Sequence, residues 1–214
     1  MFKSLVRCQL CHVDPVWQFS VCQPCWRELP WLKQQVELQE QLIWAACAYT
    51  YPLDRVIQQF KYQQQLHWQA LLVGLLQQAK PKAVQAIVPM PISTSRLIQR
   101  GYNQSLLLAK QLSKHWQLPI WQPITRQMAH SQKGLDRLER QAHISEQFHV
   151  AQTPKIRYRK VLILDDVVTT GASIHALSVK LYECGTEHVS SVCLAMAGDL
   201  RSAPRDHHLL SERC

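Results

Sequence analysis

Short apolar runs bounded by proline or polar residues predict the strands of this chain. Their length and their Val, Ile and Leu content are typical of buried strands. The run at 83–92 must end at Pro89, because proline cannot donate a hydrogen bond to a neighbouring strand. The predicted strands lie at 43–51, 83–89, 118–125, 159–164 and 188–197.

Apolar residues at helical spacing predict helices between these strands. Positions three and four residues apart are apolar in 53–62 and again in 66–79, as expected for one face of a helix. Asn103 has the side chain to cap a further helix, and Gly185 is suited to end the helix that follows the strand at 159–164. The segment 33–42, rich in Gln and Glu, is predicted to be a helical connector.

Strands that alternate with helices indicate an α/β fold, with a mostly parallel sheet and helices on both faces. Ligands bind such sheets at the carboxyl ends of the strands. The chain is predicted to divide into a small module at 1–30, one main domain at 31–200 and a tail at 201–214. Residues 126–158 are polar, basic and long for a connection, which is typical of a functional loop.

The composition is that of a globular protein. Of 214 residues, 47% are hydrophobic and 18% are charged, which excludes a disordered or fibrous chain. No apolar run reaches the roughly 18 residues that a membrane-spanning helix needs, and the N-terminus lacks the apolar core of a signal peptide. We therefore expect a cytoplasmic protein without a membrane span.

The positive charge is concentrated in the middle of the chain. The formal net charge is +9, and residues 93–160 contain 12 Lys and Arg against 3 Asp and Glu, an excess of 9. Such a segment suits DNA phosphates or a pyrophosphate, and a merely solvated surface is the alternative. It has too few aromatic residues to form a base-stacking platform.

The segment 161–173, VLILDDVVTTGAS, is the most specific motif. Four apolar residues predict a buried strand, and two carboxylates emerge at its end. The following turn offers backbone N–H groups, hydroxyls and a glycine at the start of a helix, which suits a phosphate. A ribose 5-phosphate satisfies both parts, whereas aspartate caps before an ordinary helix are the alternative. The predicted site comprises Asp165, Asp166, Val168, Thr169, Thr170, Gly171, Ala172 and Ser173.

Four cysteines near the N-terminus have the spacing of a structural metal site. Cys8, Cys11, Cys22 and Cys25 form two CxxC pairs, which give the closed tetrahedral set of thiolates typical of structural zinc. Redox-active pairs are the alternative, although neither pair begins a helix after a strand. His12 is expected to be a bystander.

The motif at 161–173 resembles the signature of type I phosphoribosyltransferases, with Ser173 in place of the usual final threonine. Three further parts resemble the ComF family of competence-linked phosphoribosyltransferase-like proteins: the CxxC pairs, IVPMPISTSRLIQRGYNQSLLLA and SQKGLDRLERQAHISEQF. Together they cover nearly the whole chain. Two positions depart from the family pattern, because Tyr102 stands where the family has Phe and His143 where it usually has Asn.

The resemblance implies a site for phosphoribosyl pyrophosphate. The two aspartates would hold the ribose diol and act as the catalytic pair, while Mg²⁺ would bridge ribose and pyrophosphate oxygens. Arg126 and Arg137 lie in the segment that corresponds to the family's flexible active-site loop. Surface arginines and a solvated lysine are the alternatives for the charged members. The implied pyrophosphate and loop residues are Lys61, Pro89, Met90, Pro91, Arg96, Arg100, Asn103, Gln132 and Arg140.

Two functions remain open at this point. The ComF resemblance implies a role in natural transformation, in which the protein handles imported single-stranded DNA in the cytoplasm together with other DNA-uptake proteins. The alternative is an active phosphoribosyltransferase of nucleotide or base metabolism. Both functions use the same pocket, and no segment of the sequence identifies the acceptor of a transfer.

Overall fold

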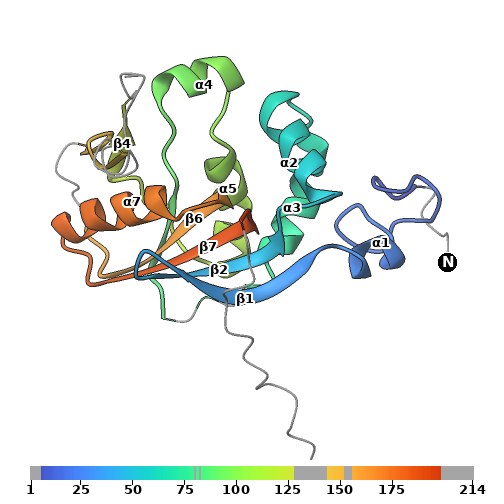
Figure 1. The fold of residues 1–214 in the computed structure, drawn as a ribbon, viewed down its shortest axis with the longest axis horizontal. Helices are drawn as coiled ribbons and strands as arrows, with labels where there is room; N and C mark the ends of the chain where they lie inside the picture. The colour runs from blue at the N-terminus through green and yellow to red at the C-terminus, as the bar shows by residue number, and fades with distance from the viewer. Residues whose placement is uncertain (1–5, 80, 82, 128–143, 152–155, 199–214) are drawn as a thin grey trace, which may run out of the picture.

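A five-stranded sheet forms the centre of the molecule (Figure 1). The computed structural model describes residues 6–79, 81, 83–127, 144–151 and 156–198. The strand order is β1-β2-β7-β6-β3, in which all neighbours are parallel except β1, which is antiparallel to β2 at one edge. This confirms the predicted mostly parallel sheet. The strands are β1 (Trp31–Leu38), β2 (Gln41–Ala48), β3 (Ala86–Pro89), β6 (Lys160–Val168) and β7 (His188–Met196).

Helices and a separate two-stranded sheet surround this centre. The small sheet joins β4 (Ile124–Arg126) and β5 (Phe148–Val150) in antiparallel fashion. The described helices are α1 (Gln23–Arg27), α2 (Leu53–Tyr62), the 3-10 turn η1 (Leu66–Trp68), α3 (Gln69–Leu76), α4 (Thr94–Arg100), α5 (Gln104–Trp116) and α7 (Ala172–Glu183).

The alternation of side chains along β6 divides the core into two layers. Leu162 and Leu164 face the layer that contains the buried residues of α2, α3 and α5. Val161 and Ile163 face the layer that contains α7 and the small β4–β5 sheet. Because successive strand residues point to opposite faces, a nearly continuous apolar run is what a sheet covered on both sides requires.

The prediction of a helical connector at 33–42 is wrong, because this segment forms β1 and a hairpin turn. Val36 lies opposite Ile43, and Leu38 lies opposite Gln41. Gln39 and Glu40 between the strands have φ angles of 49° and 59°, as in a two-residue hairpin turn. An edge strand has one solvated side and tolerates glutamine and glutamate, so composition alone favoured a helix here.

The other predicted elements agree better with the structure. Asn103 caps α5, and Gly185 follows α7 with a φ of 90°, as predicted. The predicted strand 118–125 is shorter: Ile120 forms only an isolated parallel bridge with Ile87, and β4 covers three residues. The predicted helix 66–79 is divided into η1 and α3.

The N-terminal segment packs against the main core. Val21, Trp26 and Leu29 are buried in the same cluster as the helices of one sheet face. The ring of Phe19 lies directly over Gly74 of α3, where any side chain would overlap it. The boundary near residue 30 stays a prediction, and 201–214 lie outside the described residues. Among the described helices, none has the length and hydrophobicity to cross a bilayer.

Candidate functional site

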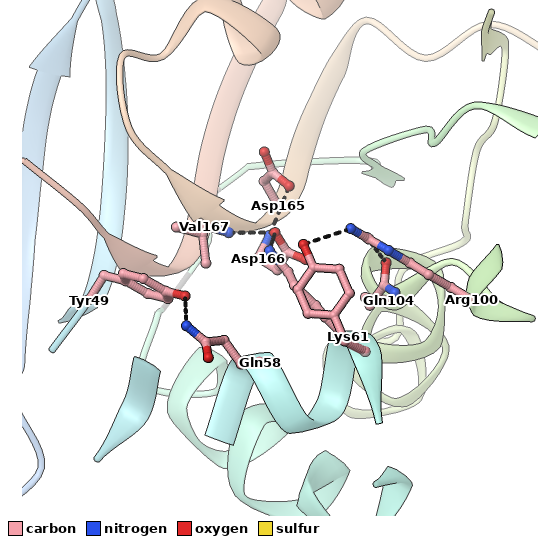
Figure 2. Close-up of polar contacts among 9 residues, drawn as sticks. Tyr49, Gln58, Lys61, Arg100, Gln104, Asp165, Asp166 and Val167 are labelled. Atoms are coloured by element: carbon pink, nitrogen blue, oxygen red, sulfur yellow. Dashed lines mark hydrogen bonds and ion pairs between the residues drawn. The ribbon is translucent and has the colours of Figure 1, made fainter. Parts of the chain in front are cut away.

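Two adjacent carboxylates lie near the carboxyl end of β6, an inner strand of the sheet between β7 and β3 (Figure 2). Asp165 is 9% exposed, and one of its carboxylate oxygens accepts a hydrogen bond from the backbone N–H of Asp166 at 2.8 Å. The Asp166 carboxylate accepts the backbone N–H of Val167 at 2.6 Å. Strand β6 continues to Val168, so the aspartates belong to the last residues of the strand and not to a loop after it.

Lys61, from the end of α2, brings a positive charge into contact with this pair. Its Nζ lies 2.8 Å from Oδ1 of Asp166, and both side chains are largely shielded, with exposed fractions of 15% and 13%. The structure therefore brings together the predicted lysine and the predicted diol carboxylate. In this arrangement Lys61 is a partner of Asp166 and not a solvated surface lysine.

The surroundings of Asp165 disfavour its charged form. Burial and the neighbouring Asp166 charge raise the pKa of Asp165 to about 7, although Lys61 and Arg126 act in the opposite direction. Burial lowers the pKa of Arg126, as does the nearby charge of Arg96, whereas Asp165 raises it. Arg126 and Arg96 therefore belong to the same electrostatic environment as the aspartates.

The turn after β6 forms a compact cradle at the start of α7. Gly171 has a φ of 78°, which L residues avoid, and a Cβ there would lie 2.9 Å from Cβ of Leu38. The Thr170 hydroxyl accepts the backbone N–H of Ala172 at 3.4 Å. Thr169 and Thr170 are exposed. Backbone N–H groups at the start of a helix of twelve residues are suited to an anion.

The loop after β3 is fixed by hydrogen bonds from two directions. The backbone N–H of Met90, between Pro89 and Pro91, donates to the Leu164 carbonyl at 2.9 Å. The Asn103 amide donates to the Met90 carbonyl at 3.0 Å, while its oxygen accepts the Leu106 N–H at 3.2 Å. Asn103 is therefore both a helix cap and a support of the predicted pyrophosphate loop.

Arg100 contacts α2 and α5 rather than the loop itself. Its guanidinium donates to the Tyr62 hydroxyl at 3.1 Å and to Oε1 of Gln104 at 3.0 Å, as Figure 2 shows for Gln104. Two residues after Arg100, the Tyr102 hydroxyl donates to the Phe60 carbonyl, and the two rings pack edge to face. The segments 60–62 and 100–102 are thus joined by side-chain contacts.

A cavity of about 450 Å³ lies beside the predicted pyrophosphate loop. Its walls come from the loop, from α4 and α5 and from β4, where Arg126 also stacks over the Phe148 ring and donates to Gln147. Arg96 lies on α4, which has no buried residue. Its side chain forms no hydrogen bond with another of the residues that the structure describes. Gln132, Arg137 and Arg140 lie outside the described residues.

Some site residues escaped the sequence analysis. Leu38 packs over Gly171, and Tyr62 and Gln104 hold Arg100. The signal for Tyr62 was present, since it follows the singled-out Lys61 and is aromatic. Leu38 gave none, because it contacts a glycine far away in the sequence. Gln104 gave none either, although it lies only four residues after Arg100.

The four N-terminal cysteines meet as predicted. Their sulfur atoms all lie within 4.8 Å of one another, with Cys11 and Cys22 at 3.7 Å. Four thiolates on one zinc ion at about 2.3 Å have sulfur separations of about 3.8 Å, so the set fits a tetrahedral ion. Backbone N–H groups of Asp14 and Val13 lower the pKa of Cys11 to about 6, whereas burial raises the pKa of Cys22 and of Cys25.

Comparison with known proteins gives several similar sequences, although no family model matches the chain. It is 32% identical over 196 residues to Competence protein F of Haemophilus influenzae, covering 84% of this chain and 86% of that protein. It is 32% identical over 157 residues to the DNA utilization protein YhgH of Salmonella typhi, covering 68% of each. With Competence protein ComFC of Bacillus subtilis it shares 31% identity over 99 residues, 46% of this chain and 39% of the other.

Solved structures give a more distant similarity. Adenine phosphoribosyltransferase from Saccharomyces cerevisiae aligns with a TM-score of 0.37 and 18% identity, covering 65% of this chain and 73% of that one. The hypoxanthine phosphoribosyl transferase of Trypanosoma cruzi aligns with a TM-score of 0.36 and 14% identity, covering 71% and 70%.

Proposed function

Because the chain belongs to the ComF family of competence proteins, we propose that it is a phosphoribosyltransferase-like protein of natural transformation that binds phosphoribosyl pyrophosphate or a related ribose phosphate. The observation that carries this proposal is the carboxylate pair followed directly by the cradle at the start of α7. A ligand with a vicinal diol and a phosphate on one small ring matches both parts at once.

The chain's own residues divide the ligand between them. Asp165 and Asp166 accept hydrogen bonds from the ribose hydroxyls, and the turn from Thr169 to Ser173 surrounds the 5-phosphate. The loop from Pro89 to Pro91, supported by Asn103, receives the pyrophosphate. Arg126 lies close enough to Asp165 to affect its pKa and adds positive charge on the same side.

Lys61 changes partner in this proposal. In the structure it neutralises Asp166, so a diol that binds this carboxylate must share it with the lysine or displace the lysine. A displaced ammonium remains beside a ligand that carries several negative charges. Lys61 thus stabilises the buried carboxylate before binding and the bound phosphates afterwards.

Two metals belong to the proposal. The cysteine set fits zinc in a structural role, since four thiolates leave no open coordination position. The carboxylate pair offers oxygen ligands of the kind that Mg²⁺ prefers, and Mg²⁺ would supply charge neutralisation for the pyrophosphate.

The biological role follows from relatives and not from the pocket. Proteins named for competence and for DNA utilization are similar over most of this chain. We propose that this protein acts in the cytoplasm on imported single-stranded DNA or with other DNA-uptake proteins. An active transferase in nucleotide metabolism is the competing function, and it uses the same carboxylates.

Calorimetry with phosphoribosyl pyrophosphate and Mg²⁺ tests the pocket. We expect binding by the wild type and a loss of at least about tenfold in Asp165→Asn/Asp166→Asn, because a neutral amide oxygen accepts hydrogen bonds from a diol more weakly than a carboxylate does. Absence of binding by the wild type would contradict the proposal. Release of pyrophosphate with candidate bases, and rescue of transformation in a deletion strain by the double variant, then separate catalysis from the competence role.

A further inference from the structure

An exposed aromatic ring stands next to the proposed ribose site. Tyr62 directly follows Lys61, whose ammonium contacts Asp166, and it ends α2 with 62% of its surface exposed. We propose that Tyr62 is a stacking platform for the nucleobase of a ligand whose ribose lies on Asp165 and Asp166. The inference rests on the proposed function and adds the chemical class of the ligand, a purine or pyrimidine nucleotide.

Arg100 holds this ring in one orientation. Its guanidinium carbon lies 4.7 Å from the ring centroid, and its Nη2 donates to the Tyr62 hydroxyl at 3.1 Å. Arg100 is itself anchored on Gln104, which is 1% exposed. An exposed tyrosine usually samples several rotamers, whereas this one is fixed from a buried point, so stacking on it costs little side-chain entropy.

The end of α2 is also clamped as a unit. The Tyr102 hydroxyl donates to the Phe60 carbonyl, and the two rings contact edge to face. Lys61 points to Asp166 between these contacts. Three consecutive residues of α2 are therefore held by three different partners, which fixes the ring relative to the carboxylate pair.

The spacing fits a nucleotide. In a nucleotide the base is attached to C1, the ring carbon next to the one that carries the 2-hydroxyl. Lys61 and Tyr62 are consecutive residues at the end of α2, and Lys61 contacts Asp166, so we place the base of a ligand whose hydroxyls contact Asp166 on the side of Tyr62. Arg100 covers one part of the ring with positive charge, and the exposed remainder can stack on a flat π system.

Stacking alone does not choose between bases, because every base has a π face. The base can come from a free nucleotide with a ribose diol or from a DNA strand, whose deoxyribose lacks the 2-hydroxyl. Both sources share the chemistry that Tyr62 recognises. Tyr62 itself lies outside the basic segment 93–160, which has few aromatic residues, although Arg100, which holds its ring, belongs to that segment.

The test compares ligands with and without a base on the intact protein. Calorimetry is run with ribose 5-phosphate, adenosine 5-monophosphate and a thymidine oligonucleotide on wild type, Tyr62→Ala and Tyr62→Phe. Tyr182→Ala is the matched control, since Tyr182 is a partly exposed tyrosine near the far end of α7. Circular dichroism confirms that each variant is folded.

We expect Tyr62→Ala to weaken the base-bearing ligands by about 5- to 150-fold, the range for loss of one base–aromatic stack, with ribose 5-phosphate unchanged. Tyr62→Phe keeps the ring and retains most of the affinity, and Tyr182→Ala retains all of it. A loss confined to the monophosphate assigns the base to a nucleotide with a ribose diol. A loss confined to the oligonucleotide contradicts the proposal, because an internal residue of a DNA strand has no diol to place on Asp165 and Asp166.

Two results overturn specific claims. If Tyr62→Ala binds the monophosphate and the oligonucleotide as tightly as the wild type, the platform is wrong while the ribose site stands. If ribose 5-phosphate fails to bind the wild type, the proposed function fails first. Equal weakening of all three ligands also contradicts the platform, because it indicates a general change of the site.

Discussion

Asp165 is the residue at which the pocket and the stability of the fold conflict. Burial and the charge of Asp166 raise its pKa to about 7, above the value of about 3.9 expected in the unfolded chain. The folded protein therefore holds this proton over a pH range in which the unfolded chain has lost it, and stability falls as the pH rises from about 4 to about 7. A carboxylate buried at this position therefore lowers the stability of the protein at neutral and higher pH.

The variant Asp165→Asn should remove this cost, since it is neutral and keeps the oxygen that accepts the Asp166 N–H. We expect it to be more stable than the wild type by on the order of 2–4 kcal/mol at pH 8, with a much smaller difference at pH 4. Urea unfolding at both pH values measures this, with Asp54→Asn as control. A gain of equal size at both pH values would exclude the buried charge as its cause.

Gly171 is a second residue whose substitution is expected to change stability, because of its backbone conformation and its close neighbour. Its φ of 78° and the 2.9 Å approach of a Cβ to Leu38 act together, whereas Gly101 has a φ of 80° with no atom near its Cβ position. Gly101→Ala should lose about 1–2 kcal/mol from the left-handed backbone alone. Gly171→Ala should lose on the order of 1–3 kcal/mol more. Equal losses in urea unfolding would show that the Leu38 contact relaxes freely.

At the scale of elements, the contact between Phe19 and Gly74 joins the cysteine module to α3. A Cβ at Gly74 would have three carbons of the Phe19 ring within 2.7 Å. Gly74→Ala should therefore destabilise by about 1–3 kcal/mol, although alanine favours a helix by about 1 kcal/mol. In a Phe19→Ala background the same substitution should stabilise. A double-mutant cycle of unfolding free energies measures this reversal of sign. Additive effects of the two substitutions would show that the Phe19 ring does not contact Gly74.

The elements that the sequence predicts well are those determined by local patterns. The run from Val161 to Leu164 and the following helix need only short-range information, as does the Asn103 cap. Strand β1 was missed because its polar residues suit an edge strand as well as a helix. The interlock of Phe60 with Tyr102 joins residues 42 apart in sequence, and no periodicity reports such a pairing. The site's carboxylates were therefore predictable, and the side chains that hold its walls were not.

The whole molecule depends on the cysteine module more than a two-domain division suggests. Cys8 and Cys22 are buried in the same apolar cluster as Phe60 and Leu71, so an ion that fixes the four sulfurs also fixes one wall of the main core. Metal binding to a site that the unfolded chain lacks contributes directly to folding free energy.

Removal of the metal should therefore destabilise the whole protein, not only its N-terminal segment. We expect one zinc per chain by elemental analysis. Chelation, or Cys22→Ser, should lower the Tm by on the order of 10 °C. Loss of the metal costs several kcal/mol, and each kcal/mol corresponds to about 2–4 °C in a chain of this size.

His12→Asn should keep the zinc, because four thiolates complete the coordination. A metal-free protein with an unchanged Tm would mean that the module folds through its apolar contacts alone, and the thiol pairs would then be open to redox chemistry.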